Sequence, residues 1–273
     1  MSNRLFLLLV SIIVLLLIFL LFSSLKLKYV NESSSPTSFK GEIFKRQAPI
    51  RRRAFRNILE SNETDHLTFY NALVPELFCS NKVRLGTVGD GGKWICSPHR
   101  LPTNCVVLSL GINNMISFDE EIQEVSEKRC RLLAFDSFAQ SKSTMDRLKT
   151  LNGNFVKAMI GNGRGGTETL SDLLKRQQID KVEILKMDIE GYEFDTIIPF
   201  VEEFRVAQIL VEVHQQNGAF GKVRILKELS KLGYWFCNQE INGRYHELVE
   251  LLLVHESQFQ RYEAYPLARY LDF

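Results

Sequence analysis

Two apolar runs in the second half of the chain end in side chains that could do chemistry. The run V-E-I-L-K-M leads into Asp188 and Glu190, and the run A-Q-I-L-V-E-V-H contains Glu212 and His214. Glu212 and His214 are two residues apart, so they share one side of an extended strand. Burying an unpaired carboxylate is costly, and histidine titrates close to neutral pH. We therefore interpret these four residues as candidate catalytic residues.

Each of the four also has a plainer interpretation. Asp188 could cap the helix expected after Gly191 and meet its dipole, and a lone histidine at a strand end is more often structural. The four could instead bind a divalent metal that lowers the pKa of an acceptor. Oxygen-rich ligands of this kind suit magnesium, calcium or manganese. We assign no metal ligand from the sequence.

The elements that must position these residues alternate between strand and helix along the chain. Strands are predicted over residues 105–110, 131–135, 155–160, 182–187 and 207–214, with helices over 118–128, 169–177 and 223–232. This alternation predicts a doubly wound, mostly parallel α/β sheet of the Rossmann-like type with right-handed crossovers. Residues 234–239 and 247–255 predict a closing C-terminal antiparallel hairpin. Ligands bind such sheets beyond the carboxyl ends of the strands.

A glycine-rich stretch precedes this sheet. V-R-L-G-T-V-G-D-G-G-K-W-I-C, residues 83–96, predicts two short strands joined by a turn around Asp90. The glycines permit positive φ and the close approach of a ligand. An ordinary hairpin turn explains the same residues equally well.

The N-terminal region predicts a membrane anchor. Residues 5–22 carry no charge and only Ser11 is polar, and as a helix they would span roughly 27 Å, about one hydrocarbon core. We divide the chain into a short tail (1–4), a single transmembrane signal anchor (5–25), a flexible basic stem (26–53) and a catalytic domain (54–273). A cleaved signal peptide is the alternative. The net charge of +2 gives no reason to expect nucleic acid as a partner.

Membrane orientation depends on two opposing signals. Arg4 precedes the anchor, whereas Lys26 and Lys28 follow it, so positive charges do not favour a lumenal C-terminal domain. The glycosylation sequons at Asn31 and Asn62 favour a lumenal C-terminal domain. We predict a single-pass type II protein of the Golgi or endoplasmic reticulum with a lumenal catalytic domain.

The five cysteines fit no metal-binding spacing. Cys79 and Cys96 flank the predicted hairpin and could pair in an oxidising lumen. Cys105 and Cys130 begin predicted strands and are expected to be small core residues. The odd count leaves at least one free or intermolecular thiol.

Six segments taken together resemble a known family. They are V-G-D-G-G-K-W-I-C, V-L-S-L-G-I-N-N with S-F-D-E-E, L-A-F-D-S, T-L-S-D-L-L, I-L-K-M-D-I-E-G-Y-E and L-V-E-V-H, between about Asn81 and His255. In order and spacing they are similar to class I S-adenosylmethionine-dependent methyltransferases of the FkbM type, in particular the methyltransferase-like protein 24 group. The departure is L-G-I-N-N, which has one glycine where many class I enzymes have two or three.

The resemblance implies an S-adenosylmethionine cofactor and gives roles to a second set of residues. Gly111 would let the backbone approach the cofactor, with Asn113 nearby as a hydrogen-bond partner. Asp136 would accept both ribose hydroxyls, although it could also be a plain helix cap. Asn162 would flank the adenine, and Asp90 is included among the cofactor-binding residues.

The implied reaction is O-methylation of a hydroxyl on a sugar or other small-molecule or glycan acceptor of the secretory pathway. Three other classes stay open. A membrane-anchored glycosyltransferase would use the D-x-E pair to hold a metal. A nicotinamide oxidoreductase is disfavoured because L-G-I-N-N-M lacks G-x-G-x-x-G. A catalytically inactive member would be a binding protein. The oligomeric state is not predicted.

Overall fold

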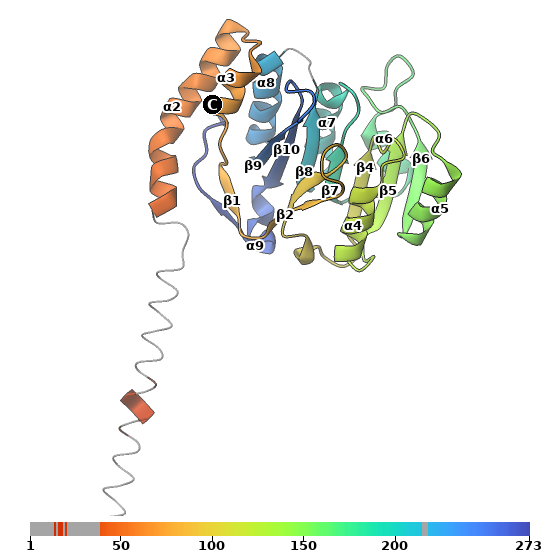
Figure 1. Cartoon of the computed structure of the whole chain (residues 1–273), viewed down its shortest axis with the longest axis horizontal. Coiled ribbons are helices and arrows are strands. Elements are labelled where there is room, and N and C mark those ends of the chain that lie inside the picture. The colour runs from red at the N-terminus through yellow and green to blue at the C-terminus, as the bar shows by residue number, and fades with distance from the viewer. Residues whose placement is uncertain (1–13, 15, 19, 21–38, 215–217) are drawn as a thin grey trace, which may run out of the picture. The chain divides into compact units, whose positions relative to one another are not determined.

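The computed structural model describes residues 14, 16–18, 20, 39–214 and 218–273. The chain divides into two compact units, residues 1–43 and 44–273. A seven-stranded sheet forms the centre of the second unit, in the strand order β6-β5-β4-β7-β8-β10-β9 (Figure 1). Its strands are β4 (Val106–Leu110), β5 (Arg131–Asp136), β6 (Gly153–Lys157), β7 (Val182–Met187), β8 (Val206–Val213), β9 (Tyr234–Ile241) and β10 (Val249–His255).

The pairing confirms the predicted doubly wound sheet. β6, β5, β4, β7 and β8 are parallel neighbours. β10 inserts between β8 and β9 and is antiparallel to both, which confirms the closing hairpin. All eight residues of β8 are buried, as expected for a strand covered on both faces.

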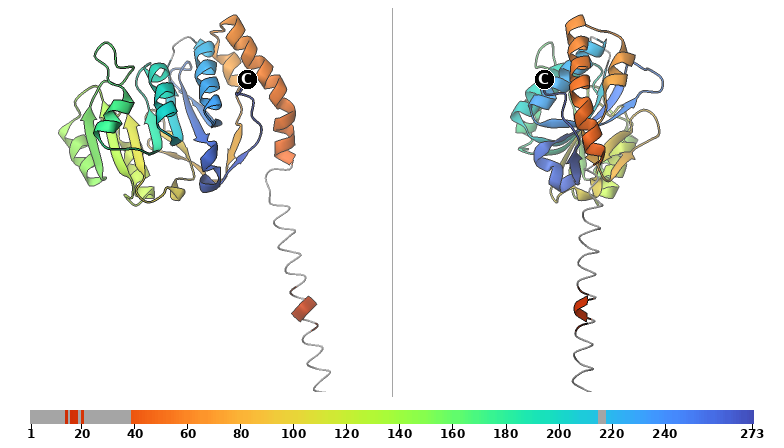
Figure 2. Two further views of the ribbon diagram at one scale, coloured as in Figure 1. Left: turned by 180° about the vertical axis from the view of Figure 1, so that it is seen from behind. Right: turned by 90° about the vertical axis from the view of Figure 1, so that its left-hand side faces the viewer.

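Helices cover both faces of the sheet (Figure 2). Buried side chains of α6 (Leu170–Arg176), α7 (Glu193–Glu203) and α8 (Gly218–Lys231) belong to one hydrophobic cluster. Those of α4 (Ser117–Val125), α5 (Lys142–Thr150) and α9 (Phe259–Tyr262) belong to a second cluster. Consecutive residues of β4 point to opposite faces of the sheet: Leu108 belongs to the first cluster and Val107 to the second. The sheet therefore separates the two cores.

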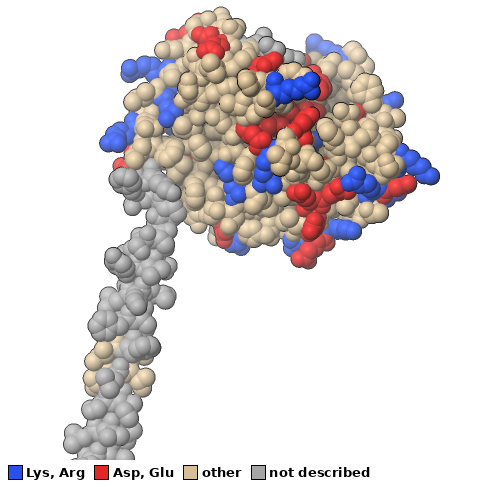
Figure 3. Space-filling view, in the orientation of Figure 1, with Lys and Arg blue, Asp and Glu red and all other residues tan. Residues whose placement is uncertain are grey.

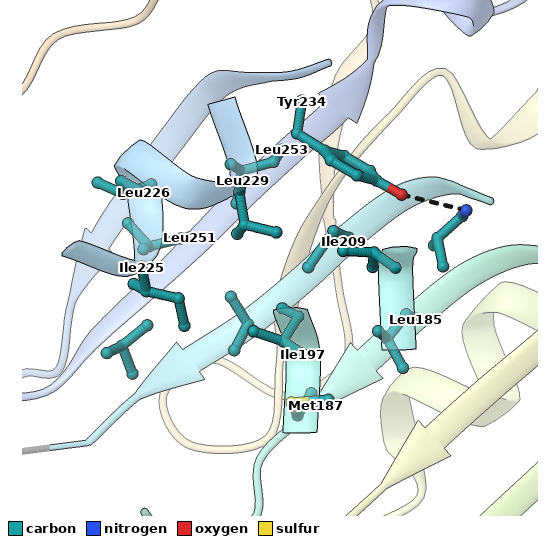
Figure 4. Close-up of a cluster of buried hydrophobic side chains, with 14 of the residues drawn as sticks. Leu185, Met187, Ile197, Ile209, Ile225, Leu226, Leu229, Tyr234, Leu251 and Leu253 are labelled. Atoms are coloured by element: carbon teal, nitrogen blue, oxygen red, sulfur yellow. Dashed lines mark hydrogen bonds between the residues drawn. The ribbon is translucent and has the colours of Figure 1, made fainter. Parts of the chain in front are cut away.

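The first core fixes the part of the sheet that carries the site. Ile197 of α7 and Leu226 of α8 lie with Met187 and Ile209 of the adjacent strands β7 and β8 (Figure 4). Full burial of one such side chain stabilises a fold by about 1.5–3 kcal/mol. The Tyr234 hydroxyl accepts a hydrogen bond from the backbone N–H that begins β8, at 3.1 Å.

A small antiparallel layer lies beside the main sheet. β2 (Lys82–Leu85) pairs with β3 (Lys93–Cys96), as the glycine-rich stretch predicts. β1 (Leu77–Cys79) pairs with β11 (Ala264–Pro266) near the C-terminus, a pairing that the sequence did not indicate. β3 also contacts β8 and β10, which holds the hairpin against the main sheet.

Four of the five cysteines form disulfides. Cys79–Cys96 is the pair expected across the hairpin. Cys105 and Cys130 are buried core residues as expected, but they are also bonded to each other, which the sequence did not predict. The reason is tertiary: they immediately precede the parallel neighbours β4 and β5, and their Cα atoms lie 4.4 Å apart. Cys237 is the free thiol and is buried.

The predicted flexible stem is partly wrong. Residues 39–53 belong to helix α2 (Phe39–Ser61), which is followed by α3 (His66–Ala72). Ala48, Phe55 and Ile58 recur at helical spacing and are buried, so this segment packs on the domain. Residues 26–38 of the predicted stem lie outside the described residues.

Other boundaries differ more modestly. β6 begins at Gly153, two residues before the predicted start, and ends at Lys157. Helix α5 was not predicted. Among the described residues, no helix has the length and apolar character needed to cross a membrane. The predicted anchor at 5–25 lies outside them, apart from residues 14, 16–18 and 20.

Candidate active site at the carboxyl edge of the sheet

The parallel strands end together at one edge of the sheet, called the carboxyl edge here. Gly111 follows β4 with φ +72°, and a Cβ at this position would lie 1.6 Å from the backbone oxygen of Asp188. Only glycine therefore allows the chain leaving β4 to pass the chain leaving β7. The backbone N–H of Asp188 donates to the carbonyl of Leu110 at 3.1 Å. Gly111 and Asp188 are neighbours, as the sequence predicts.

Asp136 ends β5 on the other side of Gly111. Its Oδ2 accepts from the backbone N–H of Asn113 at 2.8 Å, and its Oδ1 accepts from that of Phe138 at 2.8 Å. The N–H of Gly111 donates to the carbonyl of Phe135 at 2.9 Å. The structure thus brings Gly111, Asn113 and Asp136 together. Each carboxylate oxygen keeps a second lone pair for a ligand.

The other side of Asp188 meets a buried lysine. Lys93 Nζ lies 3.6 Å from Asp188 Oδ2 and 3.6 Å from Glu212 Oε2, and it also contacts Glu250. The Lys93 side chain is 1% exposed. We call Lys93, Asp188, Glu212 and Glu250 the acid cluster. The hairpin carries Lys93 to the strand ends, which explains why the β2–β3 layer packs there.

Burial and charge act against each other in the acid cluster. Burial lowers the pKa of Lys93, but the charges of Glu250, Asp188 and Glu212 outweigh it and raise that pKa above its usual value. Burial also raises the pKa of Asp188, yet Lys93 and other nearby cations hold it below the usual range. Burial raises the pKa of Glu212, and that of Glu250 to about 8.

His214 faces the same aspartate from the end of β8. Its Nε2 lies 3.8 Å from Asp188 Oδ1 and 3.3 Å from Glu190 Oε2. Its Nδ1 lies 3.0 Å from Oε1 of Glu193, which is fully buried. The same Oε1 accepts from the backbone N–H groups of Ile189 and Gly191. A carboxylate only accepts hydrogen bonds, so Nδ1 is the donor to Glu193.

These neighbours change the protonation of His214. Burial alone would lower the pKa of the imidazole, but the hydrogen bond and charge of Glu193, with the charges of Asp188 and Glu212, raise it to about 9. The sequence predicted a histidine that titrates close to neutral pH. In this site the surrounding carboxylates favour a positive charge on the imidazole.

The turn after β7 aims Glu190 outward. Glu190 has φ +55° and the following Gly191 has φ +100°, so D-I-E-G is a tight turn with two left-handed residues. The Glu190 side chain is 86% exposed, against 14% for Asp188. The pair predicted from the sequence therefore has one sheltered and one solvent-facing member.

The other two predicted cofactor residues have different neighbours. A carboxylate oxygen of Asp90 lies within 4.8 Å of oxygens of Asp188 and Glu212, beside the acid cluster. Asn162 donates to Asp195 at 3.3 Å and accepts from the N–H of Arg164. Its described hydrogen bonds connect it to α7 and to its own loop, not to the other predicted residues.

The sequence reasoning missed five residues of this site: Lys93, Lys186, Glu193, Asn242 and Glu250. Lys186 Nζ donates to the carbonyl of Gly111 at 3.2 Å, and Asn242 Nδ2 donates to Glu212 Oε1 at 3.2 Å. For three of these five residues the amino-acid sequence contained a signal that could have identified them. Lys93, Lys186 and Glu250 are charged residues inside strands whose other residues are mostly buried.

The carboxyl edge as a whole is acidic. Asp90, Asp188, Glu190, Glu193, Glu212 and Glu250 gather around two lysines and one histidine. Figure 3 shows carboxylates grouped near the middle of the face seen in Figure 1. Excess negative charge at a partly open edge favours a ligand with positive charge.

This fold, with acids at the ends of its parallel strands, is typical of α/β domains that bind small molecules at the carboxyl edge. A family model described as a methyltransferase domain matches residues 40–255. The chain belongs to this methyltransferase-domain family. The match does not distinguish the narrower FkbM-type and methyltransferase-like protein 24 groups, so that assignment stays a prediction.

Solved structures similar to this chain are also methyltransferases. The precorrin-6y C5,15-methyltransferase of Geobacter metallireducens is 15% identical, with a TM-score of 0.39, over 58% of this chain and 83% of that one. A putative ribosomal RNA methyltransferase of Plasmodium falciparum is 12% identical, with a TM-score of 0.40, over 62% and 90%. M. capricolum TrmK, solved with S-adenosyl-homocysteine, is 9% identical, with a TM-score of 0.36, over 58% and 66%.

These likenesses are too distant to carry an argument about substrate or residue roles. A search of curated proteins found no match.

Proposed function

We propose that this protein is an S-adenosylmethionine-dependent methyltransferase that O-methylates a hydroxyl of a sugar or another acceptor in the secretory pathway. The observation that supports it most is the convergence of Gly111, Asp136, Asp188 and His214 at one edge of the sheet in a chain of the methyltransferase-domain family. Methyl transfer needs mainly alignment of donor and acceptor and a route for one proton.

The residues at this edge fit the cofactor. Asp136 keeps lone pairs for ribose hydroxyls beside the Gly111–Asn113 turn. Asp188 adjoins that turn through Gly111, so its charge suits the cationic methionine end. When bound, the cofactor supplies an activated methyl group. Gly111, Asn113 and Asp136 hold it, and Asn162 is the predicted adenine contact.

The acceptor side is the opposite flank of Asp188. Glu190 faces solvent and His214 lies beside both Glu190 and Asp188, while Lys93 contacts Glu212 and Asp188 from the other side. An acceptor hydroxyl at this flank has carboxylate oxygens within reach to take its proton. We therefore assign Asp188, Glu190, Glu212 and His214 to acceptor orientation, with the carboxylates taking the proton.

The two disulfides support placing the domain in an oxidising compartment. The sequon asparagine Asn62 is exposed at the end of α2, where a glycan can be attached. With the anchor predicted at 5–25, these features support a type II membrane protein with a lumenal domain. An endoglycosidase-sensitive gel shift that is lost in Asn62→Gln and Asn31→Gln tests this placement.

Calorimetry with the purified full chain tests the cofactor assignment. We expect S-adenosylmethionine to bind, and Asp136→Asn to weaken binding roughly 10–100-fold, since a hydrogen bond to a charged group contributes about 1.5–3 kcal/mol. Asp146→Asn, on the exposed face of α5, is the matched control and should bind normally. Binding of a nucleotide sugar in place of S-adenosylmethionine would overturn the proposal in favour of a glycosyltransferase.

A further inference from the structure

Three ligand atoms converge at the solvent-facing flank of Asp188. Asp188 Oδ1 lies 3.8 Å from His214 Nε2, which lies 3.3 Å from Glu190 Oε2, and all three lie within 4.8 Å of one another. Bonds of about 2.0–2.3 Å from one metal ion place neighbouring ligand atoms roughly 3–4 Å apart. The separations of His214 Nε2 from the oxygens of Asp188 and Glu190 match this spacing.

The imidazole is already oriented as a metal ligand. Glu193 is fully buried and fixed by the N–H groups of Ile189 and Gly191, and it accepts the Nδ1 proton of His214. This leaves Nε2 to face Asp188 and Glu190. A carboxylate that holds the far nitrogen of a histidine is the usual support of a metal-binding imidazole.

An unpartnered buried oxygen provides a second, independent sign. Glu193 Oε2 is a buried carboxylate oxygen that has no hydrogen-bond partner within the described ranges. Glu193 is fully buried, and its other oxygen contacts the imidazole of His214. Buried carboxylates are normally paired or coordinate a metal, so the surroundings of His214 favour added positive charge.

A neighbouring group of acids is less suitable. Asp90, Asp188 and Glu212 also approach within 4.8 Å of one another. However, the Lys93 ammonium lies 3.6 Å from oxygens of both Asp188 and Glu212 and would repel an ion there. Lys93 binds one oxygen of Asp188 and leaves the other to the flank with Glu190 and His214.

We propose that Asp188, Glu190 and His214 bind one divalent transition-metal cation. Two carboxylates and one imidazole suit manganese or zinc better than calcium. The exposed Glu190 side leaves open coordination positions for water or for an acceptor oxygen. Resting on the proposed function, the cation would lower the pKa of the acceptor hydroxyl, and His214 would release its Nε2 proton to solvent when it binds the cation.

Manganese binding to the chelator-stripped full chain tests the site, read from the loss of the free Mn²⁺ signal in electron paramagnetic resonance. We expect one Mn²⁺ per chain, with nitrogen hyperfine modulation from the imidazole. Glu190→Gln should weaken binding at least tenfold, and since this side chain is exposed the variant should fold. Glu193→Gln should weaken binding about 10–100-fold by releasing the imidazole.

Glu202→Gln, an exposed acid on the same helix as Glu193, is the control and should bind as the wild type does. Absence of stoichiometric Mn²⁺, or unchanged binding in Glu190→Gln, would overturn the site. Calorimetry with S-adenosylmethionine on the same preparation separates the two proposals. If S-adenosylmethionine binds and Mn²⁺ does not, only the cation site is refuted. If Mn²⁺ binds and S-adenosylmethionine does not, only the proposed function is refuted.

Discussion

Two buried lysines in this protein have opposite surroundings. Lys93 lies among three carboxylates at the carboxyl edge, and their charges raise its pKa. Lys222 of α8 is also fully buried, but its Nζ contacts Nδ1 of His66 on α3, at 3.3 Å. Burial lowers the pKa of Lys222 to about 8. Within the described ranges, no carboxylate forms an ion pair with Lys222.

The difference shows what each charge does for the fold. Removing a lysine that neutralises several buried acids leaves those acids unpaired, which is strongly destabilising. Removing a buried lysine that forms no ion pair eliminates a desolvation cost. Lys93 therefore supports the site, whereas Lys222 weakens the fold at neutral pH.

The largest expected effect belongs to Lys93→Met. This change leaves Asp188, Glu212 and Glu250 without their common cation, and we expect a loss of about 3–5 kcal/mol in the free energy of unfolding. Urea unfolding at pH 7.5 measures it. Lys149→Met, at an exposed position on α5, is the control and should change stability by less than about 0.5 kcal/mol. A near-neutral Lys93→Met would show that the acids do not depend on this lysine.

Asp119 extends the comparison to a buried acid. Both of its carboxylate oxygens are buried without a hydrogen-bond partner in the described part of the chain, and burial raises its pKa to about 6. The folded state then binds more protons than the unfolded state between about pH 4 and 6, so stability falls as the pH rises through this window.

Asp119→Asn removes this pH dependence. Relative to the wild type, we expect the variant to gain about 2 kcal/mol between pH 4.5 and 7.5. Urea unfolding of both proteins at the two pH values measures the gain. An equal difference at both pH values would mean that Asp119 does not titrate in this range.

Lys222→Met has the smallest expected effect, with a sign opposite to that of Lys93→Met. The folded pKa of about 8 lies below the usual value of 10.5, so the wild type becomes more stable as the pH rises from 8 towards 10. We expect the variant to be more stable by about 1 kcal/mol at pH 7 and to lose this advantage by pH 9.5. Destabilisation at pH 7 would show that the contact with His66 outweighs desolvation.

The arrangement of the sheet followed from local patterns. Continuous apolar runs such as 182–187 and 207–214 indicated strands buried on both faces, and the helical segments between them required parallel crossovers. The helix in segment 39–53 was not predicted, because its many basic residues outnumber the one buried apolar position, Ala48, that continues the spacing of Phe55 and Ile58. Composition there described the exposed face of a helix rather than a flexible chain.

The candidate site was only partly predictable. Residues at strand ends could be found because parallel strands bring their carboxyl ends to one edge, which places Gly111, Asp136 and Asp188 together. Asp90 was assigned to the cofactor from the resemblance, and only the packing of the hairpin shows that it lies beside Asp188 and Glu212. Pairing between distant segments depends on side-chain packing that no local pattern encodes.

The amino-acid sequence determined which strands exist and which acids stand at their ends, because burial imposes a regular order on apolar residues along the chain. The tertiary structure decided how those acids are charged. Lys93 comes from the β2–β3 hairpin, Glu250 from the antiparallel strand β10 and Glu193 from the first turn of α7. Electrostatic interaction depends on distances of a few ångströms in space, and only the folded chain sets those distances.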